Sequence, residues 1–163
     1  MPVAIVEQIA LELYTRLESL LVSEGNYETL VSEVVRPTRV GIIPKHGQVV
    51  IVQGTSTEVP ELSFPGNPPA IARRQIFHIR CHIMNDEESE LPLDTLINSF
   101  ATDIIRCVTT SDDSRWHSFG ELAIDAYFLD REYVSGDGGP DGINMPIAIT
   151  YRTSENDPYT VRG

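Results

Sequence analysis

The sequence lacks most features that mark secreted or membrane-spanning proteins. Its only two cysteines are Cys81 and Cys107, and we expect both to be reduced thiols in the core, as folding in the cytosol would leave them. No apolar run approaches the roughly 18 residues of a membrane-spanning helix, so we predict no membrane partner. Residues Met1 to Val6 lack the basic start and apolar centre of a secretory signal, and we expect the chain to remain in the cell that makes it.

Positive charge is also scarce. The chain has 12 Lys and Arg against 24 Asp and Glu, a formal net charge of −12, and Lys45 is its only lysine. Proteins that hold nucleic acid need basic patches, because neutralised phosphates release counterions and so supply affinity. An acidic surface instead suits DNA that must pass without binding. Acidity that only keeps the protein in solution is the alternative interpretation.

No catalytic constellation is recognisable. His78, Cys81 and His82 lie in an alternating, strand-like stretch, where Cys81 faces away from both histidines and leaves two ligands for a zinc site that needs four. The Gly-rich run at Gly136 to Gly142 lacks the Gly-Lys-Ser/Thr ending of a phosphate loop and the twelve-residue pattern of an EF-hand. We therefore predict that the chain is not an enzyme and has no metal and no cofactor.

Two helices are predicted within a single domain of 163 residues. Apolar residues recur at three- and four-residue spacing from Ile5 to Leu21, with Pro2 suited to the start and Gly25 to the stop. A second apolar face runs from Leu93 to about Thr109. An acidic cluster precedes this helix, where the helix dipole favours negative charge, and is also a candidate acidic channel or surface. Its members are Asp86, Glu87, Glu88 and Glu90.

Five stretches read as strands. They cover residues 32–40, 48–53, 73–84, 121–128 and 143–151. Pro37 and Pro146 cannot donate a backbone hydrogen bond, so the first and last strands are predicted at an edge or a bulge. The order of helix, three strands, helix and two strands predicts an α+β fold: a mainly antiparallel sheet of about five strands with two helices packed on one face.

A Pro-rich segment without Lys or Arg, from Gly54 to Ala72, interrupts this pattern. So long a connection is uncommon in a compact domain unless it is functional or disordered. We predict an arm that packs on a neighbouring copy, helped by an extended C-terminal tail at residues 154–163; a floppy surface loop is the alternative. The predicted interface residues are Val59, Leu62, Phe64, Pro65, Ile71, Arg73, Arg74, Tyr151, Arg152, Asp157 and Tyr159.

The layout of the chain resembles the tail terminator, or tail-completion, proteins of long-tailed bacteriophages. The resemblance spans nearly the whole chain and is carried by pattern and length. Its local features are the Arg36-Pro37 strand, Gln53-Gly54 before a variable loop, the Arg74 to Ile83 strand, Trp116 before the penultimate strand, and the ending YRTSENDPY from Tyr151 to Tyr159.

The resemblance implies a structural virion protein that is made in the host cytoplasm and acts without catalysis or cofactor. Such proteins form a ring, usually of six copies, that caps the finished tail tube and presents the docking surface for the head connector. Their partners are then the tube protein and the connector, with genome DNA passing through unbound. A neck or head-completion protein is the first alternative. A small ligand-binding α+β domain that uses His78, Arg80 and His82 is the second.

Deletion of Glu58 to Ala70 tests the predicted role of the arm. The shortened chain should still fold but no longer form rings, because the arm is predicted to supply one side of the contact between copies. Unchanged rings, seen by electron microscopy, would remove the arm from the mechanism.

Overall fold

The computed structural model describes residues 1–21, 27, 31–38, 40–83, 91–110, 115–134 and 141–163. The described residues form two α-helices, two single-turn 3-10 helices and a set of strands. In order they are α1 (Ile5–Glu18), β1 (Glu33–Val35), β2 (Gln48–Glu58), η1 (Pro60–Leu62), β3 (Ala70–Ile83), α2 (Leu93–Thr109), η2 (Trp116–Ser118), β4 (Asp125–Phe128), β5 (Glu132–Val134), β6 (Asp141–Ser154) and β7 (Asp157–Val161).

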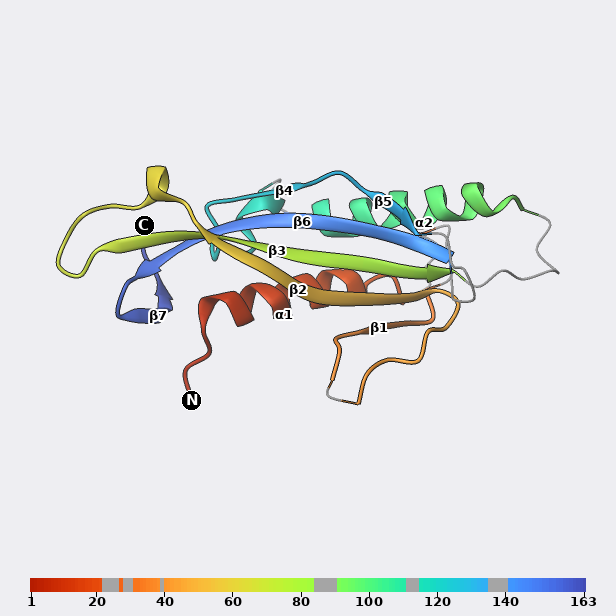
Figure 1. The fold of residues 1–163 in the computed structure, drawn as a ribbon, viewed down its shortest axis with the longest axis horizontal. Helices are drawn as coiled ribbons and strands as arrows, with labels where there is room; N and C mark the ends of the chain where they lie inside the picture. Colours follow the sequence, from red (N-terminus) through yellow and green to blue (C-terminus); the bar gives the residue numbers. More distant parts are fainter. Residues whose placement is uncertain (22–26, 28–30, 39, 84–90, 111–114, 135–140) are drawn as a thin grey trace.

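The strands form one sheet in the order β1-β2-β3-β6-β4, and β5 and β7 also pair with β6. β1 runs parallel to β2, and the other pairings are antiparallel. The longest pairing joins β3 to β6 without a register shift, from Ala70 opposite Ser154 to Ile83 opposite Asp141. Figure 1 shows β2, β3 and β6 running the length of the molecule and extending at one end past both helices.

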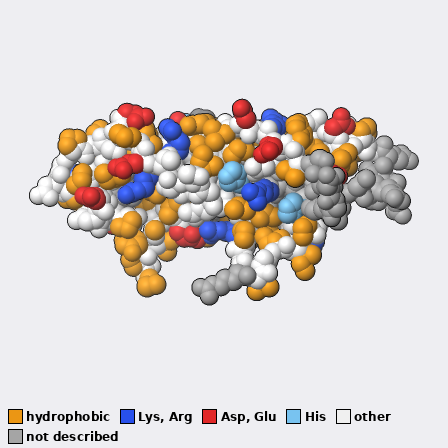
Figure 2. Space-filling view, in the orientation of Figure 1, with side chains coloured by type: hydrophobic (Ala, Val, Ile, Leu, Met, Phe, Trp, Pro, Cys, Tyr) orange, Lys and Arg blue, Asp and Glu red, His pale blue; other side chains and the backbone are white. Residues whose placement is uncertain are grey.

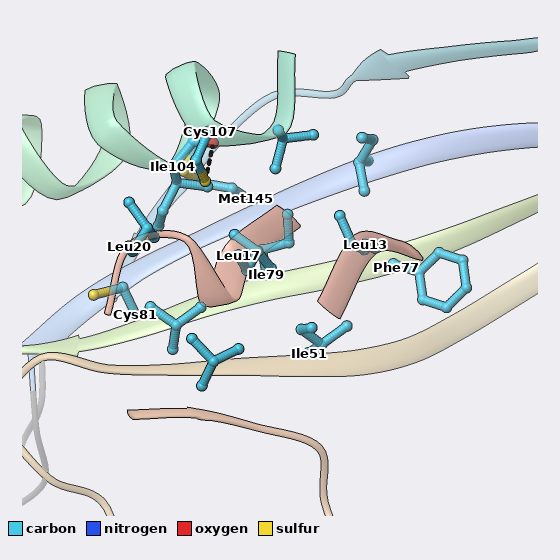
Figure 3. Close-up of a cluster of buried hydrophobic side chains, with 14 of the residues drawn as sticks. Leu13, Leu17, Leu20, Ile51, Phe77, Ile79, Cys81, Ile104, Cys107 and Met145 are labelled. Carbon is cyan, nitrogen blue, oxygen red and sulfur yellow. Dashed lines mark hydrogen bonds between the residues drawn. The ribbon is translucent and has the colours of Figure 1, made fainter. Parts of the chain in front are cut away.

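Both helices bury their apolar stripes against the same face of the sheet. In Figure 3, Leu13 and Leu17 of α1 and Ile104 of α2 lie over the sheet, with Leu17 beside Ile79 of β3 and Ile104 near Met145 of β6. All five side chains are at most 2% exposed. Burial of each such side chain contributes about 2 kcal/mol, so this layer is the main source of stability. The core also contains both cysteines as free thiols, as predicted, and burial raises the pKa of each to about 12.

Arg16 ties the end of α1 to the end of α2. Its Nη1 donates to the carbonyl oxygens of Val108 at 2.9 Å and Trp116 at 2.8 Å, and its Nε pairs with Glu12 at 3.0 Å. The guanidinium also lies 4.2 Å from the ring centroid of the buried Phe119. This half-buried cation therefore satisfies backbone acceptors that the end of α2 and the η2 turn would otherwise leave unpaired.

The second face of the sheet carries no helix among the described residues. His78, Arg80 and His82 of β3 point to this side, because successive strand residues alternate between faces. Figure 2 looks onto this open face and shows histidine side chains on either side of a basic side chain near its middle. The molecule is therefore a two-layer structure in which the second sheet face, with polar side chains near its middle, is not covered by a helix of the described residues.

The predicted α+β class is confirmed, including two helices on one face. The sheet has seven strands rather than about five. The sequence did not reveal β5 and β7, because all but one of their residues are exposed and no alternation marks them. Other bounds also differ: α1 ends at Glu18 rather than Leu21, β1 spans only Glu33–Val35, and β4 begins at Asp125. The proposed stop at Gly25 lies outside the described residues.

The prediction that Pro146 marks an edge or bulged strand is wrong, because β6 is central. The Pro146 carbonyl accepts from the Leu129 N–H at 2.8 Å. In an antiparallel strand the N–H and C=O of one residue point to the same neighbour, so the missing donor also faces this side. β4 pairs with Ile147 to Thr150 and β5 with Gly142 to Asn144, so the proline lies at the gap between them.

Gly142 provides a test of the close β3–β6 pairing. A Cβ at this position would lie 2.2 Å from the Cys81 carbonyl oxygen, which only a shift of the two backbones could relieve. We expect Gly142→Ala to destabilise the fold by about 3 kcal/mol, measured by urea unfolding. Gly163→Ala, where the added atom meets nothing within 4 Å, is the control. Equal unfolding midpoints for both variants would contradict the observed pairing.

Candidate interaction site

The sheet extends past the helices as a ribbon, which we call the distal end and define as residues 54–74 and 151–163 (Figure 1). β2 continues to Glu58, and Ser56 and Glu58 pair with Gln75 and Arg73. A register shift between Gln53 and Ser56 bulges the strand where it leaves the body. The predicted arm at 54–72 is therefore largely a β-hairpin, and its irregular part is confined to residues 59–69.

The tip of the hairpin is ordered by contacts within its own chain, rather than being the floppy surface loop that was the alternative interpretation. Backbone hydrogen bonds of 2.9 and 3.0 Å join Phe64 to Ala70 in both directions. Arg152, which is 8% exposed, donates from Nε to the Leu62 carbonyl at 2.9 Å, and its guanidinium lies 4.2 Å from the Phe64 ring centroid. Ser63 Oγ accepts from the Ala72 N–H at 2.9 Å. Together these contacts fold the tip back over the end of the sheet.

The C-terminal segment is likewise folded back rather than extended. β7 pairs with β6 through Ser154 opposite Asp157, and the Asp157 carboxylate accepts from the Tyr159 N–H at 3.0 Å. Arg162 then donates to the Pro68 carbonyl at 2.6 Å and to Ser154 Oγ at 3.2 Å. The turn residues in the Ser-Glu-Asn-Asp-Pro stretch were the sequence signal for this hairpin. Arg162, which the sequence predictions omitted, locks the tail against the tip.

The predicted interface residues divide into buried and accessible groups. Val59, Tyr151 and Arg152 are 3%, 7% and 8% exposed, so they stabilise their own chain and offer little surface to a partner. Phe64 and Tyr159 are 49% and 46% exposed and form the apolar part of the accessible surface. Pro65 is exposed as well, whereas Leu62, Ile71 and Asp157 are half-buried.

Arg73 and Arg74, both predicted interface residues, point to opposite faces of β3, because adjacent strand residues alternate. Arg74 points to the open face, where its guanidinium lies 5.9 Å from the Tyr127 ring centroid; its Nε is buried without a hydrogen-bond partner among the described residues. Arg73 points to the helix side, beside Tyr151. A single partner surface therefore cannot engage both residues from one side.

The acidic cluster Asp86, Glu87, Glu88 and Glu90 lies outside the described residues, as does most of the Gly-rich run. The predicted acidic channel or surface therefore stays a prediction. Among the described acidic residues, Glu7 pairs with Arg36 at 2.7 Å, and the hydrogen bond from this arginine lowers the pKa of the Glu7 carboxyl.

The open face has a hollow of about 410 Å³ that Arg80, His82, Glu132 and Asn144 help to line. His82 Nδ1 lies 2.7 Å from the Gln48 side-chain oxygen, and burial together with the charge of Arg80 lowers the pKa of His82. The hollow therefore combines a neutral imidazole, a cation and a carboxylate. Such a mixture can bind a polar molecule but does not define a reaction.

Within the described part of the chain, no three His, Cys, Asp or Glu residues are grouped to hold a metal ion. Neither described helix combines the length and apolarity needed to cross a bilayer. Searches against protein-family models and against curated proteins find no match to this chain. Function must therefore be argued from the geometry of the molecule itself.

Arg152→Met tests how the distal end is ordered. Loss of the guanidinium removes both the hydrogen bond to Leu62 and the contact with Phe64, so we expect hydrogen exchange at the Phe64 and Ala70 amides to accelerate about tenfold or more. The exposed Arg131→Met is the matched control and should leave these rates unchanged. Unchanged exchange in Arg152→Met would show that other contacts hold the tip.

Proposed function

We propose that this chain is a structural virion protein whose copies form a ring on the end of a phage tail tube. The ring ends tube growth and presents the docking surface for the head connector. The observation that carries the proposal is the distal end, a ribbon that leaves the body of the domain and exposes Phe64 and Tyr159. Exposed apolar side chains on such a ribbon do not stabilise an isolated domain, whereas in an assembly they can be buried against another subunit.

The geometry favours a head-to-tail contact, in which the distal end of one copy meets a different surface of the next. Contacts of this kind close into a ring when the rotation between copies permits. Because the chain itself already orders the tip, little conformational entropy is lost on docking. Ile43, Tyr133 and Val134 are 80%, 56% and 46% exposed and belong to the loop and strand at the other end of the sheet, where they offer a second apolar surface.

The charge of the chain supports the same proposal. A net charge of −12 in each copy, multiplied around a ring, repels a polyanion such as the genome from the channel wall. The ring is proposed to have six copies, as the family resemblance implies, and to reside at the neck of the virion after assembly in the host cytoplasm. No cofactor is required for such a role.

Two alternatives are distinguished by experiment. A neck protein one layer above would share this composition, and particles that lack it would have normal free tails and unfilled or leaking heads. Loss of a tail terminator instead gives tails of uncontrolled length. A ligand-binding domain would use the hollow at Arg80 and His82, and alanine at His78, Arg80 and His82 would then abolish ligand binding while sparing assembly.

The double variant Phe64→Ser and Tyr159→Ser tests the ring contact. Both side chains are about half exposed, so we expect the monomer to lose at most about 1 kcal/mol of stability while the ring dissociates, as native mass spectrometry would report. Leu11→Ser, on the exposed side of α1 at 47% exposure, is the matched control and should retain rings. Rings of the same size in the double variant would refute the contact.

A further inference from the structure

A second, smaller hollow lies on the helix side of the sheet, where the first turn of α1 meets the base of the distal end. Its volume is about 220 Å³. Residues from α1, β3, β6 and the following turn surround it. They include Ala4, Val6, Arg73, Tyr151, Thr153 and Glu155.

The α1 side of this hollow is a helix N-terminus without a cap. Ala4 occupies the N-cap position, and no side chain accepts a hydrogen bond from the first turn. The first N–H groups of a helix lack acceptors within the helix, and the helix dipole makes this end partly positive. Ala4 and Val6 thus bring an electropositive end to the hollow.

The sheet side contributes an unpaired buried hydroxyl. Thr153 is 1% exposed, and its Oγ1 has no hydrogen-bond partner among the described residues. A buried hydroxyl without a partner is unfavourable by about 1–3 kcal/mol, and such groups in folded proteins are rare enough to need an explanation. Thr153 is also one of the residues that line the hollow, so a ligand bound there lies next to this unpaired group.

Arg73 adds a full positive charge to the same wall. It is half-buried and forms no ion pair within the described part of the chain. Burial raises the pKa of the Tyr151 hydroxyl, and the nearby charge of Arg73 partly counteracts this increase. Arg73, Tyr151, Thr153 and the first turn of α1 thus gather around one small space.

We propose that this hollow binds a carboxylate group. A carboxylate suits this site because its negative charge complements Arg73 and the start of α1. Its two oxygens can accept several hydrogen bonds and can pair with arginine. Glu155 at the edge of the hollow carries one opposing charge, which favours a monoanion over a dianionic phosphate.

The carboxylate is supplied by an acidic side chain of a second copy, an assignment that rests on the proposed ring. Each copy carries 24 acidic residues against 12 basic ones, so acidic side chains abound on any neighbouring surface. The hollow also adjoins the distal end, to which the ring contact is assigned.

The binding test uses N-acetyl-glutamate amide and its glutamine analogue, which differ by one carboxylate, titrated into the full chain and followed by NMR at the Thr153 and Val6 amides. The glutamate compound should shift these signals and the glutamine compound should not. Arg73→Gln should weaken binding about tenfold or more, because a charged hydrogen bond is lost. Arg131→Gln is the matched control. Equal shifts with both compounds, or unchanged binding in Arg73→Gln, would overturn the proposal.

Thr153→Val separates a binding role from a structural one. If the hydroxyl serves a ligand, its replacement by an apolar group of the same shape should weaken glutamate binding and raise the melting temperature of the monomer, since an unpaired buried group is removed. A lower melting temperature with unchanged binding would contradict the proposal. Tighter binding of inorganic phosphate than of the glutamate compound would also contradict it.

The source of the carboxylate is tested by ring formation in the same variants. Loss of rings in Arg73→Gln, with rings retained in Arg131→Gln, supports a carboxylate from a second copy. If rings persist in Arg73→Gln although glutamate binding is lost, the carboxylate does not come from a second copy, and the proposed ring is unaffected. Absence of rings in the unmodified chain would instead refute the proposed function, and the NMR titration would still decide whether the hollow binds a carboxylate.

Discussion

The pairing of β3 with β6 is the constraint on which the rest of the structure depends. Each strand has 14 residues, and they pair without a register shift along their whole length, a span of about 45 Å. The longer part of this pair forms the floor of the core under α1 and α2, and the shorter part continues into the distal end. A slip of one residue between them would turn the buried side chains of one strand to the opposite face along its whole length. The core and the distal end therefore share a single register.

The balance of forces changes along that pair. Over the helices, burial of apolar side chains such as Ile79 and Met145 stabilises the sheet. Beyond the helices only a few apolar side chains of the described residues, such as Val59, are buried, and hydrogen bonds from Arg152 and Arg162 to backbone carbonyls hold the two hairpins together. Polar contacts of this kind each contribute less than a buried apolar side chain, but they fix geometry. The distal end is thus ordered yet keeps Phe64 and Tyr159 exposed, as an interaction surface requires.

The sequence correctly predicted those helices and strands that are marked by a local pattern of apolar residues. The apolar face from Leu93 to Thr109 and the alternation in β3 both appear in the structure, because each reflects burial against a single core. The path of residues 54–72 was missed, because its prolines obscured a hairpin that depends on contacts distant in sequence. The hairpin at residues 154–163 was missed although turn residues mark it, because its strand is short and exposed. Tyr151 and Arg152 were chosen as partner residues from their chemistry; that they are buried followed only from the tertiary fold. The helix-side hollow left no sequence signal, since its residues come from three separate segments of the chain.

A structure of the assembled particle by electron cryomicroscopy tests the central claim most directly. The account predicts that Phe64 and Tyr159 of each copy are buried against a neighbouring copy in a closed ring at the end of the tail tube. If the distal end instead contacts only its own domain in the working particle, with both side chains in solvent, the account is contradicted.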